Sequence, residues 1–217
     1  MSLRLDWCSH EAAKYAVEHW HYSKCMPMGG DVRIGVWEDN KFIGSVVYGR
    51  PPFPSLSKSY KLTPHQLCEL QRVALNIHQS QTSRIVSISR KMLYKLSPNL
   101  RLIVSFADNE QGHYGGIYQA DGWIYTGEFN GEAGVIINGK REHGRTIRHR
   151  YGTVKGFEVI KGKKYRYLYP LDDEMRKQIE PLRKPYPKKS CGTGEIDNAA
   201  QSNAQTGGAS PTVPLLE

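Results

Sequence analysis

The segment CELQRVALNIHQSQTSRIVSISRKMLYKLSPNLRLIVSF, residues 68–106, decides the fold. Residues 68–75 and 102–106 are largely apolar and have the composition of buried strands. Between them, Thr82 or Ser83 can cap a helix that runs to Leu96 and places a row of apolar residues on one face, and these are Ile85, Ile88, Met92 and Leu96. A strand, a helix and a strand in succession indicate an α/β domain.

The flanking sequence extends this unit on both sides. Ser9 precedes an amphipathic stretch and is expected to cap a helix over residues 10–20. Asp39-Asn40 and Asn138-Gly139 are turn pairs, so each is expected to connect the strands of a hairpin. The other expected elements are strands at 3–6, 32–38, 41–48, 123–127 and 135–137, helices at 111–120, 145–151 and 172–182, and a hairpin around 161–163.

The predicted fold class is α/β, with a central mixed sheet and helices on both of its faces. We expect a main domain over residues 1–151 and a basic C-terminal extension over residues 152–189. The role of this extension stays open between a DNA clamp and a segment that completes the fold. Residues 190–217 have no aromatic side chains and are rich in small polar residues, so we expect a disordered tail.

Positive charge is concentrated in one part of the chain. Residues 1–139 hold 14 basic and 12 acidic residues, whereas residues 140–189 hold 16 basic and 6 acidic residues, a net charge of +10. Aromatic side chains are interleaved with these cations, which favours a nucleic acid as the partner over a merely solvated lysine-rich surface. The candidate DNA-binding residues in this block are Arg141, Arg145, Arg148 and Arg150.

Composition excludes several classes of protein. The chain has no run of about 18 consecutive apolar residues, so no membrane partner is expected. Its N-terminal residues lack the apolar core of a signal peptide, and its four cysteines show no CxxC pair. We therefore expect a cytoplasmic protein with free thiols. Oligomeric state is not indicated by the sequence.

His21 and Tyr22 follow the first predicted helix and are free to point into a binding site. Imidazole and phenolate are ligands for iron, copper or zinc, but the sequence alone favours a histidine that caps the helix and a tyrosine that packs beneath the loop. Asp108 ends the strand that begins at residue 102, at the edge of the sheet where ligands bind in open α/β folds. It can be a general base, a metal ligand or the cap of the next helix.

Tyr118 and Arg72 are candidates because of their surroundings. Tyr118 lies on the helix that follows Asp108, so the two side chains can converge, although Tyr118 can also be a core residue. Arg72 interrupts an otherwise apolar strand and needs a partner there. Asp108, a bound phosphate or a structural ion pair would each satisfy this charge.

Six segments of the chain together resemble a known family. They are HWHYSKCMP from residue 19, VRIGVWE from 32, ELQRVAL from 69, SRIV from 83, VSFAD from 104 and GGIYQADGW from 115. Their order and spacing over residues 2–151 are similar to those of the Mom family of phage DNA-modification proteins. The order of strands and helices also resembles the fold of the GNAT acyltransferases.

The resemblance implies an enzyme that converts adenine N6 in double-stranded DNA into N6-carbamoylmethyladenine and so protects phage DNA from host restriction. The catalytic residues that it implies are Arg72, Ser83, Asp108 and Tyr118. It also implies bound iron, and the candidate ligands are His21, Tyr22, Asp108 and Tyr118.

One loop departs from the acyltransferase pattern. Those enzymes bind the pyrophosphate of coenzyme A at a glycine-containing loop before the central helix, where backbone N–H groups meet phosphate oxygens. The corresponding residues 76–84, NIHQSQTSR, contain no glycine, so acetyl coenzyme A is not the expected donor and the carbon donor stays unidentified. Ser83 and Arg84 are expected to bind an anionic group of a different donor. A non-catalytic DNA-binding protein and a coenzyme A-dependent N-acetyltransferase are the alternatives.

Overall fold

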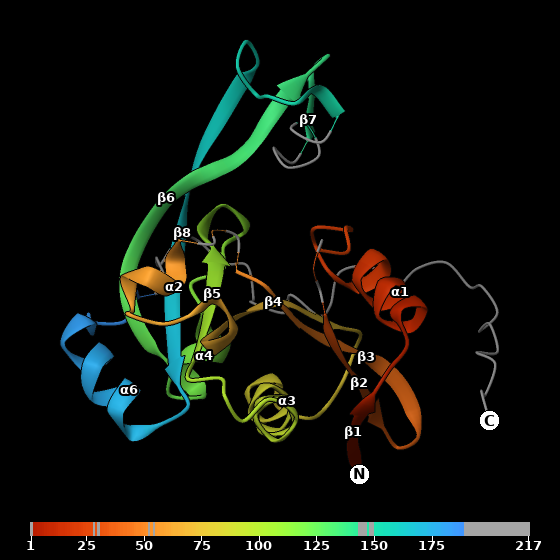
Figure 1. Ribbon diagram of the computed structural model, residues 1–217. Coiled ribbons are helices and arrows are strands. Elements are labelled where there is room, and N and C mark those ends of the chain that lie inside the picture. Colours follow the sequence, from red (N-terminus) through yellow and green to blue (C-terminus); the bar gives the residue numbers. More distant parts are fainter. Residues whose placement is uncertain are drawn as a thin grey trace.

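The protein forms one eight-stranded sheet in the order β1-β2-β3-β4-β5-β8-β6-β7 (Figure 1). This computed structural model describes residues 2–27, 29, 31–51, 53, 55–142, 147 and 150–188. The strands are β1 (Leu3–Trp7), β2 (Val32–Glu38), β3 (Lys41–Gly49), β4 (Leu67–Leu75), β5 (Leu102–Asp108), β6 (Ile124–Ile137), β7 (Lys140–Glu142) and β8 (Glu158–Pro170). The helices are α1 (His10–Trp20), α2 (Leu56–Ser59), α3 (Thr82–Leu96), α4 (Gly116–Ala120) and α6 (Asp173–Ile179), with short 3₁₀ turns η1 (Pro64–Gln66), η2 (Asn109–Gln111) and η3 (Glu180–Leu182).

Helices cover both faces of the sheet, which confirms the predicted fold class. Successive residues of a strand point to opposite faces. Val46 of β3 packs in the cluster that contains Ile85 and Leu93 of α3, whereas its neighbour Val47 packs with Val17 of α1. The two longest helices therefore lie on opposite sides of β3.

The sheet opens at the ends of its two central strands. β4 and β5 are parallel, but they pair only between Leu67–Glu69 and Leu102–Val104. Beyond this point β4 pairs only with β3, while β5 pairs with β8 as far as Asp108. The carboxyl ends of β4 and β5 therefore diverge, and side chains from both faces of the sheet can meet between them.

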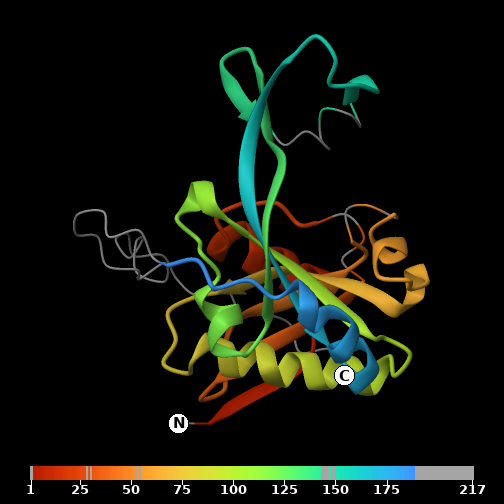
Figure 2. The same cartoon turned by 90° about the vertical axis from the view of Figure 1, so that its left-hand side faces the viewer.

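β6 and β8 form a long antiparallel pair that extends beyond the body of the protein (Figures 1 and 2). Where β5 ends, at the pair between Asp108 and Lys164, the sheet narrows to a ribbon. We call the described residues between 130 and 163 the arm, and β7 pairs with β6 in its outer part. β8 lies between β5 and β6, so residues 158–170, which belong to the expected C-terminal extension, complete the central sheet.

Several predicted elements differ from the observed ones. The hairpin expected around residues 161–163 is wrong, because Gly162 lies inside β8 opposite Gly131. The strands expected at 123–127 and 135–137 are one strand, β6, which two register shifts bend. The helix expected at 111–120 is reduced to η2 and α4, because Gly115 adopts a φ of +85°.

Other predictions are confirmed. Ser9 caps α1 by accepting the Ala12 N–H at 3.2 Å. α3 extends to Leu96 as predicted, but its N-cap residue is Gln81, so the prediction that Thr82 or Ser83 caps it is wrong. Asp39 and Asn40 both have positive φ, as a tight hairpin turn requires. The helix expected at 145–151 lies mostly outside the described residues, as does the whole predicted tail.

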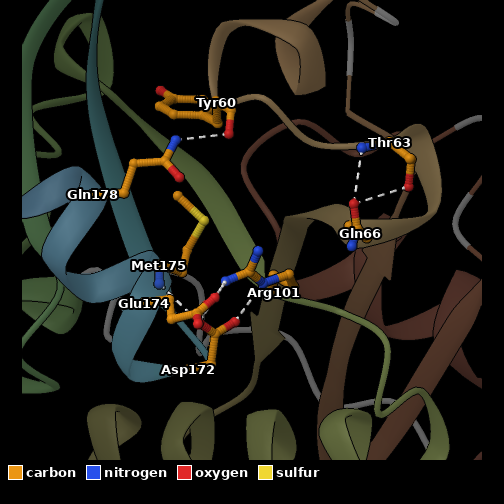
Figure 3. Close-up of polar contacts among 8 residues, drawn as sticks. All are labelled: Tyr60, Thr63, Gln66, Arg101, Asp172, Glu174, Met175 and Gln178. Carbon is orange, nitrogen blue, oxygen red and sulfur yellow. Dashed lines mark hydrogen bonds and ion pairs between the residues drawn. The ribbon is translucent and has the colours of Figure 1, made fainter.

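Residues after β8 return to the body through polar contacts (Figure 3). Arg101 donates to both carboxylate oxygens of Asp172, at 2.7 and 2.8 Å, and to Glu174 at 3.1 Å. Asp172 also caps α6 by accepting the Met175 N–H at 2.7 Å. The predicted helix at 172–182 is therefore α6 followed by η3. Within the described residues, no helix is long and apolar enough to span a membrane.

Candidate functional site

The end of α1 delivers His21 and Tyr22 to the open ends of β4 and β5. Ala13, Ala16 and Val17 are fully buried against β3 and β4, which fixes the position of the helix. His21 is its C-cap residue with extended backbone, and its ring packs against that of Tyr22 with centroids 4.4 Å apart.

Arg72 connects β4 to the loop after α1. A β-bulge precedes it, because Val47 pairs with Arg72 whereas Tyr48 pairs with Leu70, which leaves Gln71 as the extra residue. The Arg72 Nε donates to the Cys25 carbonyl oxygen at 3.3 Å. Its guanidinium therefore lies beside the chain segment that carries His21 and Tyr22.

Asp108 and His113 approach the same place from β5. The His113 backbone N–H donates to the Asp108 carbonyl oxygen at 3.1 Å, which folds the loop after β5 back onto the strand end. The His113 ring lies edge-on to Tyr22 at 5.2 Å between centroids. Tyr22 keeps 47% of its surface exposed, yet desolvation raises the pKa of its hydroxyl, and the Asp108 carboxylate raises it further. Arg72 opposes this shift.

Tyr118 closes the site from the opposite side of the sheet. It is 8% exposed, and its hydroxyl is hydrogen-bonded to Ser105 at 2.8 Å. The Ser105 Oγ also donates to the Leu70 carbonyl oxygen at 2.8 Å. Burial raises the pKa of Tyr118 to about 12, with the Ser105 bond opposing it and Tyr22 adding to the shift. Tyr118 is therefore a protonated phenol at neutral pH.

These contacts define a strand-end cluster, which consists of His21, Tyr22, Arg72, Asp108, His113 and Tyr118. Burial lowers the pKa of His21 to about 3, and the positive charge of Arg72, followed by His113 and Lys24, contributes to the shift. The Ser23 backbone N–H donates to His21 Nδ1 at 3.1 Å, which places the ring proton on Nε2. His21 is thus a neutral hydrogen-bond donor rather than a general base.

Comparison with known proteins assigns the chain to a family. The model of the Mom protein family matches residues 2–188. The chain belongs to the Mom protein family. A curated relative, the protein named methylcarbamoylase mom from Escherichia phage Mu, is 25% identical over 202 residues, which cover 86% of this chain and 84% of the relative.

Solved acetyltransferases have partly similar backbones. One from Acinetobacter baylyi covers 86% of this chain and 97% of its own at 12% identity and a TM-score of 0.47. A chimera of spermidine N-acetyltransferase from Vibrio cholerae covers 82% of this chain and 99% of its own at 15% identity and a TM-score of 0.48.

In this Mom family chain, the predicted site residues fall into two groups. His21, Tyr22, Arg72, Asp108 and Tyr118 are brought together, whereas Ser83 and Arg84 lie in the first turn of α3. Among the described residues, no hydrogen bond or ring contact joins Ser83 or Arg84 to the cluster. His113 was not predicted; its signal was a position five residues after Asp108, in a glycine-containing loop that returns to the strand end.

The loop before α3 is hydrogen-bonded to a carboxylate side chain of the protein itself. The Glu38 carboxylate accepts the backbone N–H groups of Gln79 at 2.9 Å and of Ser80 at 2.8 Å. Backbone N–H groups at this position are the donors that a phosphate would use at a helix start. Glu38 therefore competes with any phosphate at this loop, in agreement with the missing glycine.

Two of the predicted DNA-binding arginines, Arg141 and Arg150, belong to the arm. Arg150 is exposed, donates to Glu142 at 3.2 Å and has its guanidinium 5.8 Å from the Tyr151 ring centre. Arg141 belongs to β7, and Arg145 and Arg148 lie outside the described residues.

The described residues contain no group of three or more His, Cys, Asp or Glu side chains that could hold a metal ion. The predicted iron ligands include only two such residues, His21 and Asp108, together with two tyrosines. A surface cavity of about 470 Å³ lies away from the cluster, beside Gln66 and Arg101 at the opposite ends of β4 and β5.

Proposed function

We propose that this protein modifies the N6 amino group of adenine in double-stranded DNA, converts it to N6-carbamoylmethyladenine, and thereby protects phage DNA from host restriction in the host cytoplasm. Membership of the Mom family supports this, as does similarity to the phage Mu relative named methylcarbamoylase mom. The observation that carries the proposal is the convergence of a carboxylate, an arginine and two tyrosines at the open ends of β4 and β5.

The chemistry requires an exposed base and a proton acceptor. Adenine N6 is a weak nucleophile, because its lone pair is delocalised into the ring, and in duplex DNA the base must be rotated out of the stack. Formation of the new N6–carbon bond releases one N6 proton and breaks the bond between the transferred carbon and the rest of the donor, which leaves with the electron pair of that bond. Asp108 is the carboxylate of the strand-end cluster, so we assign it as the acceptor of this proton.

The other cluster residues bind and orient in this proposal. His21 presents a neutral Nε2–H, which can donate to a ring nitrogen of the base. Tyr118 supplies a phenolic proton, and Arg72 orients the Asp108 carboxylate or an anionic part of the donor. Tyr22 keeps half of its surface exposed beside them, so its ring is available to stack on the purine.

The carbon donor is proposed to bind without a diphosphate at the loop before α3. Glu38 occupies the N–H groups of Gln79 and Ser80, which disfavours acetyl coenzyme A. Ser83 and Arg84 retain their proposed role as contacts for an anionic group of another donor. Arg84 is exposed and Ser83 half-buried at the N-terminal end of α3, where the helix dipole favours anions.

Iron is a separate proposal, with His21, Tyr22, Asp108 and Tyr118 as the residues that would hold it. The donor types fit, because imidazole, phenolate and carboxylate bind iron. Both phenols would also have to lose protons. Bound iron would supply redox activation of the carbon donor.

Elemental analysis tests the iron proposal independently of activity. Iron at a constant ratio to wild-type protein, reduced in Tyr22→Phe, would support it. The same iron content in both proteins would contradict the assignment of this ligand set.

DNA is proposed to contact the arm, and Arg141, Arg145, Arg148 and Arg150 are assigned to its phosphates. The charge of this region also fits a DNA-binding protein without catalysis, so the test must detect the product. Plasmid DNA from cells that express the protein, or carry an empty vector, is digested to nucleosides for mass spectrometry. Carbamoylmethyl-adenine only in the expressing cells, with resistance of the plasmid to restriction, is expected. Unaltered nucleosides would contradict the proposal.

A further inference from the structure

The arm is a two-stranded ribbon that leaves the body of the protein (Figure 2). Its ladder continues from the pair Asn130–Lys163 to the pair Ile136–Glu158, beyond the end of β5. The ribbon is therefore a protrusion that has no third strand beside it along residues 130–134 within the described part of the chain.

More than half of the net charge of the protein lies in the sequence segment 130–163, which includes the arm. Residues 130–163 contain eight basic and three acidic residues, a net charge of +5 out of +9 for the whole chain. Lys140, Lys155 and Lys161 are exposed, and none of them forms an ion pair with another described residue. Among the described residues, no acidic side chain neutralises these cations.

One face of β8 changes its character where the strand leaves the body. Alternate residues of a strand share a face, and Tyr165 and Tyr167 pack into the core on this face. The next two positions of the same face are Lys163 and Lys161, both exposed. An apolar row that becomes a basic row indicates that the outer half of β8 faces solvent or a polyanion, not another part of the protein.

We propose that the arm enters the major groove of duplex DNA as a two-stranded β-ribbon. This inference rests on the proposed function, because it names how the DNA substrate is held. Strands of a ribbon lie about 4.8 Å apart, and the major groove, about 12 Å wide, admits such a ribbon, whereas the minor groove is about 6 Å wide. A ribbon in the groove has phosphates along both edges, where the lysines of the arm can reach them.

The length of the arm sets how much DNA it covers. From Lys164, which is paired with Asp108, to Glu158 the strand rises about 20 Å at about 3.3 Å per residue. This corresponds to about 6 base pairs at about 3.4 Å per pair. Since the arm projects from one side of the strand-end cluster, the contacted duplex lies on one side of the target adenine.

The first test measures how DNA affinity depends on salt. The triple variant Lys140→Gln/Lys155→Gln/Lys161→Gln is compared with Lys41→Gln/Lys58→Gln/Lys177→Gln, which removes three exposed lysines from the body. The slope of log affinity against log salt should fall by about 0.9 for each lysine that contacts a phosphate. We expect a fall only in the arm variant, with equal thermal unfolding of both. Equal slopes in both variants would overturn the proposal.

The second test identifies the groove. Dimethyl sulfate methylates guanine N7 in the major groove and adenine N3 in the minor groove. We expect protection of guanine N7 over about 6 base pairs on one side of the bound site, and its loss in the arm variant. Protection confined to adenine N3 would overturn the proposal.

The two tests separate this inference from the proposed function. Modified adenine in cells, combined with DNA binding that does not depend on the arm, would overturn the ribbon proposal and leave the proposed enzymatic function standing. Arm-dependent protection of guanine N7 with unmodified nucleosides would support the ribbon proposal and contradict the proposed enzymatic function.

Discussion

Replacement of Tyr118 by Phe removes one hydroxyl group from the strand-end cluster and leaves the ring in place. The ring packs against Trp123 and Tyr167 at centroid distances of 5.1 and 5.0 Å, and Phe retains these contacts. The lost hydroxyl is hydrogen-bonded to Ser105. Because Ser105 also donates to the Leu70 carbonyl oxygen, it is not left without a partner.

The expected effects on stability and on activity differ in size. Loss of one buried hydrogen bond should lower the free energy of unfolding by about 1 kcal/mol. If the hydroxyl gives its proton to the reacting groups, its loss should slow modification about 100- to 10,000-fold. This corresponds to about 2.7–5.4 kcal/mol in the activation barrier, several times the change in stability.

A second buried tyrosine provides a matched control. Tyr48 is 1% exposed, its hydroxyl bonds Ser89 at 2.8 Å, and Ser89 in turn donates to the Val86 carbonyl oxygen at 2.9 Å. Tyr48→Phe should therefore lose similar stability but no activity. The assay is the fraction of modified adenine in plasmid DNA, with thermal unfolding of each purified protein. Equal modification by the Tyr118→Phe and Tyr48→Phe variants would refute a chemical role for Tyr118.

Three further predictions concern stability and binding. Asp172→Ala removes the cap of α6 and the partner of Arg101, so its free energy of unfolding should be about 1 kcal/mol lower, while Asp172→Asn should retain the cap and lose less. Arg101 lowers the pKa of Asp172, so the charge of Asp172 should stabilise the wild type relative to Asp172→Asn. This difference in the free energy of unfolding should be complete above about pH 4 and vanish as the pH falls through the pKa of Asp172 in the folded protein. A difference that persists in strong acid would contradict this. The folded-state pKa of His21 is about 3. The pKa of histidine in the unfolded chain is about 6.5. As the pH falls from about 6.5 towards 3, His21 is therefore protonated in the unfolded chain but not in the folded protein, so the free energy of unfolding should decrease. His21→Gln should reduce this decline in denaturant titrations at several pH values, and an identical decline in both proteins would count against the buried neutral imidazole. Acetyl coenzyme A should give no thermal stabilisation of the wild type, because Glu38 occupies the loop before α3; a dose-dependent rise in melting temperature would show that coenzyme A binds.

The central part of the fold could be predicted because its signals are local. Apolar spacing placed α3, Ser9 placed the start of α1, and the turn pair at Asp39 placed the first hairpin. The path of β8 could not be predicted, because a strand that inserts between β5 and β6 is fixed by long-range pairing. The Lys-Gly-Lys sequence at 161–163 has the composition of a turn, and cross-strand pairing with β6 overrides this local preference.

Much of the strand-end cluster could be predicted for a similar reason. Asp108 was identified by its place at the end of an apolar strand, and Arg72 by its charge within another. His113 was missed, because its position depends on the fold of the loop back onto β5. Its contact with Tyr22 joins residues that are far apart in sequence, and no local sequence pattern predicts such a contact. The role of Glu38 at the loop before α3 is hidden in the same way.

The most direct test of the strand-end cluster as a reaction centre is nucleoside mass spectrometry of plasmid DNA from cells that express Asp108→Ala. Asp173→Ala, which removes an exposed carboxylate from α6, is the matched control. The account predicts carbamoylmethyl-adenine with wild type and the Asp173 variant, and none above background with the Asp108 variant at equal protein levels. Normal amounts of the modified base with Asp108→Ala would remove the carboxylate from the chemistry and contradict the central claim.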